Sequence, residues 1–281
     1  MCLERYLDAK RSVLLFSKGV ILVEGDGEEI LLPAMVKKAL GVSLDELGIG
    51  LINVGSVSFE YVASLFDSQR LQRYCAIITD SDAILTGATK CNTEAAARGE
   101  SRKVKLKDLY GQNPWVGDYY APYTFEVDFA NKSQNHPYIE SVINSTYTQQ
   151  AVIEKHIANL NGTDAERYDT VLTVAGALGK GWYATLLAAA LDENVVIPNY
   201  ILQAIAFSSQ SIVDEKILKK MALHLISTFD DNDDVNAQRE ILTSSNTKEE
   251  IEKALNELCK KYPSNTFASF HSCRKDLKNV Q

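Results

Sequence analysis

The chain has 281 residues, of which 46% are hydrophobic, so it can bury a sizeable core in one large domain or two smaller ones. Its formal net charge of −8 excludes a generally basic, histone-like nucleic-acid-binding protein, because such proteins gain affinity by neutralising phosphates. Its five cysteines form no CxxC pair and no cluster with histidine, which indicates neither a zinc site nor a disulfide framework and fits a reduced, cytoplasmic location.

The chain carries no recognisable targeting or membrane signal. Its charged opening, MCLERYLDAKRS, lacks the apolar centre of a secretory signal peptide. No apolar run approaches the roughly 18 residues that a membrane-spanning helix needs. We therefore expect no membrane partner.

The first third of the chain alternates apolar strand-like runs with amphipathic helix-like runs. After a lead-in helix closed by Gly19, the expected elements are a strand at 20–23, a helix at 28–40, a strand at 50–54, a helix at 58–67 and a strand at 74–79. This order predicts a parallel sheet with right-handed crossovers, whose ligands lie at the carboxyl ends of the strands.

The later segments are less regular. Residues 84–111 look like a surface excursion, and their basic stretch 102–107 has the charge to touch a DNA backbone, although a solvated loop is the favoured interpretation. Alternation in DYYAPYTFEVDF predicts a strand at 118–129 with Glu126 and Asp128 on one face. Further expected helices are 141–160, 180–192 and 198–207, followed by two or three amphipathic helices broken near 230–234 and 262–264.

Carboxylates follow two of the predicted strands. Glu24 and Glu28 flank the glycines after the first strand, and Asp80 and Asp82 follow the third. A simple β–α turn explains the first group by itself, and a solvated loop explains the second. Their joint order within one α/β unit favours a shared site, in which converging carboxylates would hold Mg²⁺ or a similar hard cation. Two ions held in this way can promote phosphodiester cleavage.

These residues resemble a known family. Val23-Glu24-Gly25 with Glu28, followed by Asp80-Ser81-Asp82, is similar to the TOPRIM domain of topoisomerases, bacterial primases, small ribosomal-RNA maturase nucleases and OLD (overcoming lysogenisation defect) nucleases. The strings LLFSKGVILVEGDGEEILLPAMVKKALG and INVGSVSFEYVASLF resemble the OLD nucleases in particular, as do TFEVDF and GKGWYATLLAAAL with IPNYILQAI further on. The resemblance covers about residues 6–207 and does not extend past residue 211.

The resemblance implies an α/β fold of the TOPRIM (Rossmann-like) type, a mainly parallel sheet flanked by helices, with additional C-terminal helices. We expect a lead-in helix at 1–18, the TOPRIM nuclease domain with an insertion and helical elaboration at 19–207, and a C-terminal helical region at 208–281. The implied metal ligands, for two Mg²⁺, Mn²⁺ or Ca²⁺ ions, are Glu24, Glu28, Asp80, Asp82, Glu126 and Asp128.

Two residues have further implied roles. Glu24 would also help to activate the nucleophile, and Lys180 would be the family's essential lysine, which stabilises charge developing on the phosphate. The sequence pattern alone favours a solvent-facing Lys180. The Gly179-Lys180 pair is no nucleotide site, because a P-loop needs glycine at the position of Val174 and serine or threonine at that of Gly181.

The expected function is a metal-dependent endonuclease or nickase acting on DNA. The alternatives are a TOPRIM module of another class, primase-like or topoisomerase-like, and a non-catalytic assembly module. The expected partners are DNA and an upstream ATPase domain, with this chain as the C-terminal nuclease half of a longer enzyme or a stand-alone relative. The amphipathic C-terminal helices also permit a homodimer. Antiphage defence, phage interference and repair all remain open as the biological role.

Overall fold

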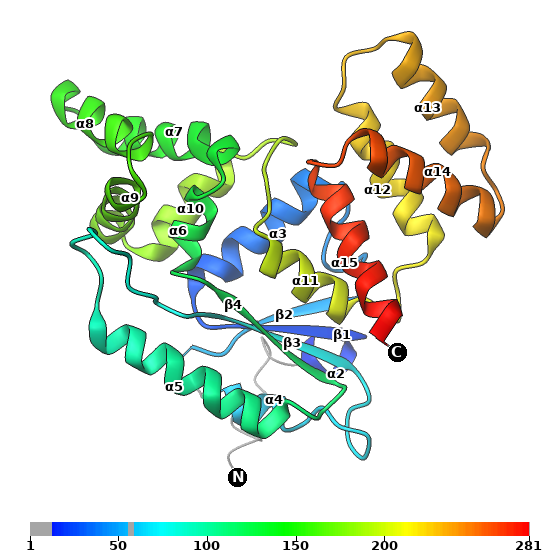
Figure 1. Ribbon diagram of the computed structural model, residues 1–281, viewed down its shortest axis with the longest axis horizontal. Helices are drawn as coiled ribbons and strands as arrows, with labels where there is room; N and C mark the ends of the chain where they lie inside the picture. The colour runs from blue at the N-terminus through cyan, green and yellow to red at the C-terminus, as the bar shows by residue number, and fades with distance from the viewer. Residues whose placement is uncertain (1–12, 56–58, 281) are drawn as a thin grey trace.

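The computed structural model of the chain describes residues 13–55 and 59–280. At its centre lies a sheet of four parallel strands: β1 Gly19–Val23, β2 Ile49–Asn53, β3 Tyr74–Asp80 and β4 Val116–Ala121. The strands lie in the order β2-β1-β3-β4 (Figure 1). The predicted α/β class and the parallel sheet are confirmed, and the first three strands lie within one residue of their predicted bounds.

Helices cover both faces of the sheet. Along β1, Ile21 and Val23 face the main core beneath α3 (Asp26–Leu40) and α11 (Asn199–Ser208), whereas Val20 and Leu22 face α4 (Phe59–Ala63) and α5 (Thr93–Tyr110). Figure 1 shows α3 and α11 above the sheet and α4 and α5 below it. Burial on both faces explains why β1 is a continuous run of branched apolar residues.

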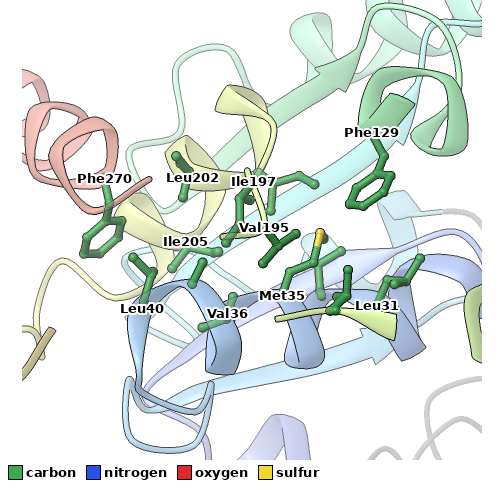
Figure 2. Close-up of a cluster of buried hydrophobic side chains, with 14 of the residues drawn as sticks. Leu31, Met35, Val36, Leu40, Phe129, Val195, Ile197, Leu202, Ile205 and Phe270 are labelled. Atoms are coloured by element: carbon green, nitrogen blue, oxygen red, sulfur yellow. The ribbon is translucent and has the colours of Figure 1, made fainter. Parts of the chain in front are cut away.

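The main core extends from α3 into the C-terminal helices. Figure 2 shows Met35 and Val36 of α3 packed with Val195 and Ile197, which precede α11, and with Leu202 and Ile205 inside it. Phe270, from α15 (Thr266–Val280), lies at the far end of the same cluster. The last helix is therefore continuous with the core that supports the sheet.

The direction in which strands are added to the sheet reverses between β1 and β3, while all strands remain parallel. From β1 the chain passes outward through α3 to β2, whereas from β3 it passes to the other side through α5 to β4. In a sheet of this kind, the crevice at the carboxyl ends of these two strands is where ligands bind. Leu22 pairs with Ile77, so Glu24 is level with Thr79 at this edge.

The remaining helices form two groups on the α3 side of the sheet (Figure 1). The first group, with its short 3-10 turn Ser133–Asn135, comprises α6 Phe125–Ala130, α7 His136–Thr146, α8 Gln150–Leu160, α9 Asp164–Leu178 and α10 Lys180–Ala190. The predicted helix at 141–160 is two helices, α7 and α8, and the sequence predicted no helix at the positions of α6 and α9.

The C-terminal region contains four helices rather than two or three. The breaks predicted near 230–234 and 262–264 occur at 228–232 and 262–265, and one more break occurs at 245–247. The helices are α12 Glu215–Ser227, α13 Asp233–Ser244, α14 Lys248–Lys261 and α15. Asn232 caps α13, because its side-chain oxygen accepts hydrogen bonds from the backbone N–H groups of residues 234 and 235.

Three local predictions are wrong. The strand predicted at 118–129 ends at Ala121, and Thr124 then caps helix α6 by accepting a hydrogen bond from Val127 N–H. The predicted surface excursion contains the 18-residue helix α5, capped by Asn92. Gly19 is the first residue of β1 and does not close a helix; the preceding helix α2, Val13–Phe16, ends earlier, and the rest of the predicted lead-in helix lies outside the described residues.

In the described part of the chain, no single helix has the length and apolarity to cross a membrane. Helices α9 and α10 reach that length and apolarity only when joined, and they are bent by 107° at their junction.

Candidate functional site

The first two carboxylates of the site come from the β1–α3 connection. Glu24 follows the last residue of β1, and Glu28 lies in the first turn of α3, where it is only 7% exposed. Gly25 lets the two approach, since a Cβ atom there would lie 3.3 Å from Glu28 Oε2. The apolar strand and the helix that follows it therefore set both carboxylates at the crevice edge.

The second pair follows β3. Asp80 is the last residue of that strand, and its Oδ1 accepts a hydrogen bond of 3.0 Å from Phe125 N–H at the start of α6. Asp82 has a left-handed backbone, with φ of 51°, and its N–H donates to Tyr123 O at 2.9 Å. A positive φ is costly for a residue other than glycine and commonly marks a site where a side chain must be aimed.

Two groups arrive from far along the chain. Glu126, in the first turn of α6, is 3% exposed and forms an ion pair with Lys180, whose Nζ lies 3.1 Å from its Oε1. Lys180 is the first residue of α10, and 60% of its side chain is exposed. Its ammonium group therefore neutralises a buried carboxylate while remaining accessible from solvent.

Burial and mutual proximity shift the pKa values of these groups. Burial raises the pKa of Glu28 to about 7, and the negative charges of Glu126 and Glu24 add to the rise. Burial, with Glu28 and Glu126, also raises the pKa of Asp80 well above its usual range. Although burial alone would lower the pKa of Lys180, the carboxylates of Glu126 and Asp80 raise it. The tertiary structure thus gathers acids from three separate segments, with Lys180 from a fourth.

Asp128 lies apart from this group. Because α6 is a helix, residues two positions apart point in different directions, and Asp128 does not share a face with Glu126. Its Oδ2 accepts a hydrogen bond from Tyr123 N–H at 3.0 Å, and its Oδ1 accepts one from Asn131. One oxygen therefore stabilises the β4–α6 connection, and the other stabilises the C-terminal end of α6.

Three further polar residues belong to the site and carry no motif of their own. Arg102, from α5, forms an ion pair with Glu24 and donates to the hydroxyl of Thr79, which itself donates to Glu24 at 3.0 Å. Asn53, at the end of β2, donates to both Asp26 and Glu29 at 2.9 Å and so holds these two acids beside β2. The sequence indicated a site role for Asn53 and Thr79 only indirectly, because both lie at the carboxyl ends of predicted strands.

The donor set has the chemistry of a divalent-cation site. Five carboxylates, Glu24, Glu28, Asp80, Asp82 and Glu126, face two side-chain cations, Arg102 and Lys180. The buried hydroxyl of Tyr200 lies beside these acids and has no hydrogen-bond partner among the described residues. Excess buried negative charge and an unsatisfied polar atom both fit a hard cation with its water.

The carboxylates of the site are not arranged around a single metal position in this structure. Within residues 13–55 and 59–280, no three histidine, cysteine, aspartate or glutamate side chains lie close enough to ligate a single ion. Arg102 and Lys180 instead engage Glu24 and Glu126 individually. The residues therefore fit a metal centre in kind and neighbourhood, and binding would require these side chains to reorient.

The position of α5 depends on one glycine. A Cβ atom on Gly99 would lie 2.4 Å from the carbonyl oxygen of Ser81, so Gly99→Ala must push the helix off the β3–α5 connection. We expect a loss of about 1 to 3 kcal/mol in the free energy of unfolding, measured by urea denaturation. Gly176→Ala is the control: in α9 a Cβ atom meets nothing within 4 Å, so this change should stabilise by roughly 0.5 to 1 kcal/mol. Equal effects at the two positions would contradict close α5 packing.

The fold and the site together define a class of protein. In this parallel sheet a glutamate follows the first strand, and Asp-Ser-Asp lies at the end of the third. Both lie where the strand order reverses. This arrangement is that of a TOPRIM-type α/β domain. Residues 15–82 match the sequence model of the family described as "Overcoming lysogenization defect protein-like, TOPRIM domain". The chain thus carries an OLD-like TOPRIM domain.

Solved structures with a similar fold are C-terminal regions of OLD proteins. That of Burkholderia pseudomallei has 24% sequence identity and a TM-score of 0.53, and the match covers 70% of this chain and 100% of that one. That of Xanthomonas campestris pv. campestris has 25% identity and a TM-score of 0.50, covering 70% of this chain and 96% of that one. A comparison with the sequences of curated proteins gave no significant match.

Proposed function

We propose that this protein is a divalent-metal-dependent endonuclease or nickase that cleaves DNA phosphodiester bonds. The observation that carries the proposal is the gathering of Glu24, Glu28, Asp80 and Glu126 at the sheet edge between β1 and β3, in an OLD-like TOPRIM domain. Nothing in a purely structural role requires several buried carboxylates to share one crevice, because their mutual repulsion costs stability.

The acids of the site would hold the metal ions. We assign Glu24, Glu28, Asp80, Asp82 and Glu126 as ligands, and place Asp128 in a supporting position at the edge of the site. Bound divalent ions, two in the expected arrangement, would activate a water molecule and stabilise the leaving oxygen. The residues themselves orient that chemistry: Thr79 and Arg102 fix Glu24, and Phe125 N–H fixes Asp80.

Lys180 is assigned to the substrate phosphate. Its ammonium group is held by Glu126 yet is mostly exposed, so it can contact a phosphate oxygen at the mouth of the crevice. Positive charge placed in advance at this point favours the transition state, in which negative charge on the phosphate develops. Glu24, as the most exposed of the acids, is assigned to help activate the nucleophile.

The partners follow from the same reasoning. The substrate is DNA, and α5, which brings Arg102 to the site, also carries Arg98 and Lys107 as exposed positive charges. The similar solved structures are C-terminal regions of OLD proteins, so we propose that this module works with an ATPase domain in a longer protein. We also propose that its units are the segments 1–18, 19–207 and 208–281, with the last available for homodimer formation.

The direct test is cleavage of supercoiled plasmid DNA. We expect nicked and then linear DNA in Mg²⁺, Mn²⁺ or Ca²⁺, no cleavage with EDTA, and none by Glu24→Ala. Undiminished cleavage by the variant would refute the assignment. Relaxed, religated circles or primer synthesis from nucleotides would instead indicate a topoisomerase-like or primase-like module, and the absence of metal binding would indicate an assembly module.

Replacement of Lys180 by alanine should slow cleavage by about 10²-fold to 10³-fold, the usual effect of removing one group that stabilises transition-state charge. The rate constant at saturating metal and plasmid is the measurement. Lys132→Ala is a suitable control, since it removes a lysine near the end of α6 that makes no ion pair with Glu126 among the described residues. A Lys180→Ala enzyme with the wild-type rate constant would show that the lysine only neutralises Glu126.

A further inference from the structure

Arg102 is unlike the other basic residues of α5. The helix is largely exposed, with only Gly99 and Leu106 buried, and the side chains of Arg98 and Lys105 are open to solvent. Arg102 lies between these two on the same face, but it turns inward and is 22% exposed. Its guanidinium group enters the crevice from the side of the sheet opposite α3.

The contacts of Arg102 converge on one carboxylate oxygen. Arg102 Nη1 forms an ion pair with Glu24 Oε2 and donates to the hydroxyl of Thr79, and that hydroxyl donates to the same Oε2. Thr79 is fully buried, so it holds the pair in a fixed position. Glu24 itself is 47% exposed, so solutes can reach it from solvent.

A guanidinium group and a divalent cation compete for the same carboxylate. Both are attracted by its negative charge, and an oxygen that accepts two hydrogen bonds has little capacity left for a metal. A guanidinium group that leaves a carboxylate retains five donors in a planar fork, which suits a phosphate better than an ammonium group does. Other acids of the site are close by: burial raises the pKa of Asp82, and the positive charge of Arg102 offsets part of that rise.

We propose that Arg102 occupies Glu24 in the metal-free protein, leaves it when a divalent cation binds there, and then binds a phosphate group of the nucleic acid. The inference rests on the proposed nuclease function and adds one residue and an order of events to it. Arg102 thereby keeps the acidic crevice neutralised before metal arrives, and it makes tight DNA binding depend on metal binding. The step breaks and forms only non-covalent contacts.

Metal affinity without DNA tests the first half of the proposal. Mn²⁺ titration followed by electron paramagnetic resonance should give a dissociation constant at least about fivefold lower for Arg102→Gln than for the wild type, because the competing hydrogen bonds are gone. Lys103→Gln is the matched control: Lys103 is the next residue on α5 and lies over the ring of Tyr120, 5.5 Å from its centre. It should leave the constant unchanged.

DNA affinity tests the second half. Fluorescence anisotropy with a phosphorothioate duplex, which resists cleavage, should show at least about fivefold weaker binding by Arg102→Gln at saturating Mn²⁺. Without metal the loss should be smaller, because Arg102 is then engaged by Glu24. If Arg102→Gln does not fold, Arg102→Lys replaces it. An ammonium group is more strongly hydrated than a guanidinium group and gives up Glu24 more readily, so this variant should also bind Mn²⁺ more tightly than the wild type.

The outcomes separate the inference from the proposed function. A wild-type protein that binds no Mn²⁺ would refute the metal site itself. Mn²⁺ binding that is unchanged or weakened in Arg102→Gln would overturn the displacement while leaving the nuclease proposal intact. Tighter Mn²⁺ binding with unchanged DNA affinity would overturn the transfer of Arg102 to a phosphate.

Discussion

Replacement of Asp80 by asparagine should abolish DNA cleavage while leaving the fold intact. Asp80 closes β3 beside Glu24, and its Oδ1 accepts the hydrogen bond of Phe125 N–H that starts α6. Asparagine retains an oxygen at this position but loses the charge that a metal ion requires. Because a bound metal contributes several kcal/mol to transition-state stabilisation, the rate should fall by on the order of a thousandfold or more.

The Asp80→Asn experiment separates a chemical role from a structural one. Plasmid cleavage and thermal unfolding in EDTA are measured on the same preparation, and the variant should unfold no earlier than the wild type, since it removes a buried charge. Asp118→Asn is the control: this acid lies on the neighbouring strand and bonds the hydroxyl of Tyr120. Its cleavage rate should not change. A folded Asp80→Asn protein with wild-type activity would remove Asp80 from the site.

Replacement of Glu28 by glutamine should stabilise the metal-free protein at pH 8. Burial raises the pKa of Glu28 from 4.5 to about 7 in the folded state. The folded state therefore holds the proton more tightly, so the contribution of Glu28 to stability is fully present below pH 4.5 and is lost as the pH rises through 7. The shift corresponds to roughly 3 kcal/mol, which glutamine should recover at pH 8.

The measurement is urea unfolding in EDTA at pH 5 and at pH 8. Wild-type protein should lose stability between the two, and Glu28→Gln should lose less. Glu29→Gln, one residue further along α3 and bonded to Asn53, is the control and should follow the wild type. Divalent metal at pH 8 should stabilise the wild type more than Glu28→Gln, because the metal replaces the proton on this carboxylate. Identical pH slopes for wild type and Glu28→Gln would show that Glu28 is not buried as described.

The local pattern of the first eighty residues was sufficient to predict the sheet. The continuous runs of branched apolar residues around Ile21 and Ile77 are typical of strands that are buried on both faces. A helix between two such strands makes them parallel, because it returns the chain to the starting end of the sheet. The carboxyl edge, and with it Glu24 and Asp80, follows from that topology. Glu24 and Asp80 lie at the predicted edge of the sheet.

The segment 118–130 shows where such reasoning fails. Alternating apolar and acidic residues around Glu126 predicted a strand, but Pro122 and the capping hydroxyl of Thr124 end the strand and start α6. A period of two over only three apolar residues is too short to decide between strand and helix. Thr124, a residue type preferred at the N-cap of a helix, was the sequence signal that favoured a helix over a strand here.

The sequence by itself determined the α/β class, the parallel order of the first strands and the positions of Glu24 and Asp80, because these depend on hydrophobic periodicity and on short connections. Only the tertiary structure decided that Glu126 and Lys180 join them, that Asp128 turns away, and that Arg102 engages Glu24. The Arg102–Glu24 pair alone joins residues 78 apart in the chain, through helix packing that leaves no local periodicity. The physical reason is that a charge pair depends on distance in space, and neither partner needs a particular neighbour in sequence.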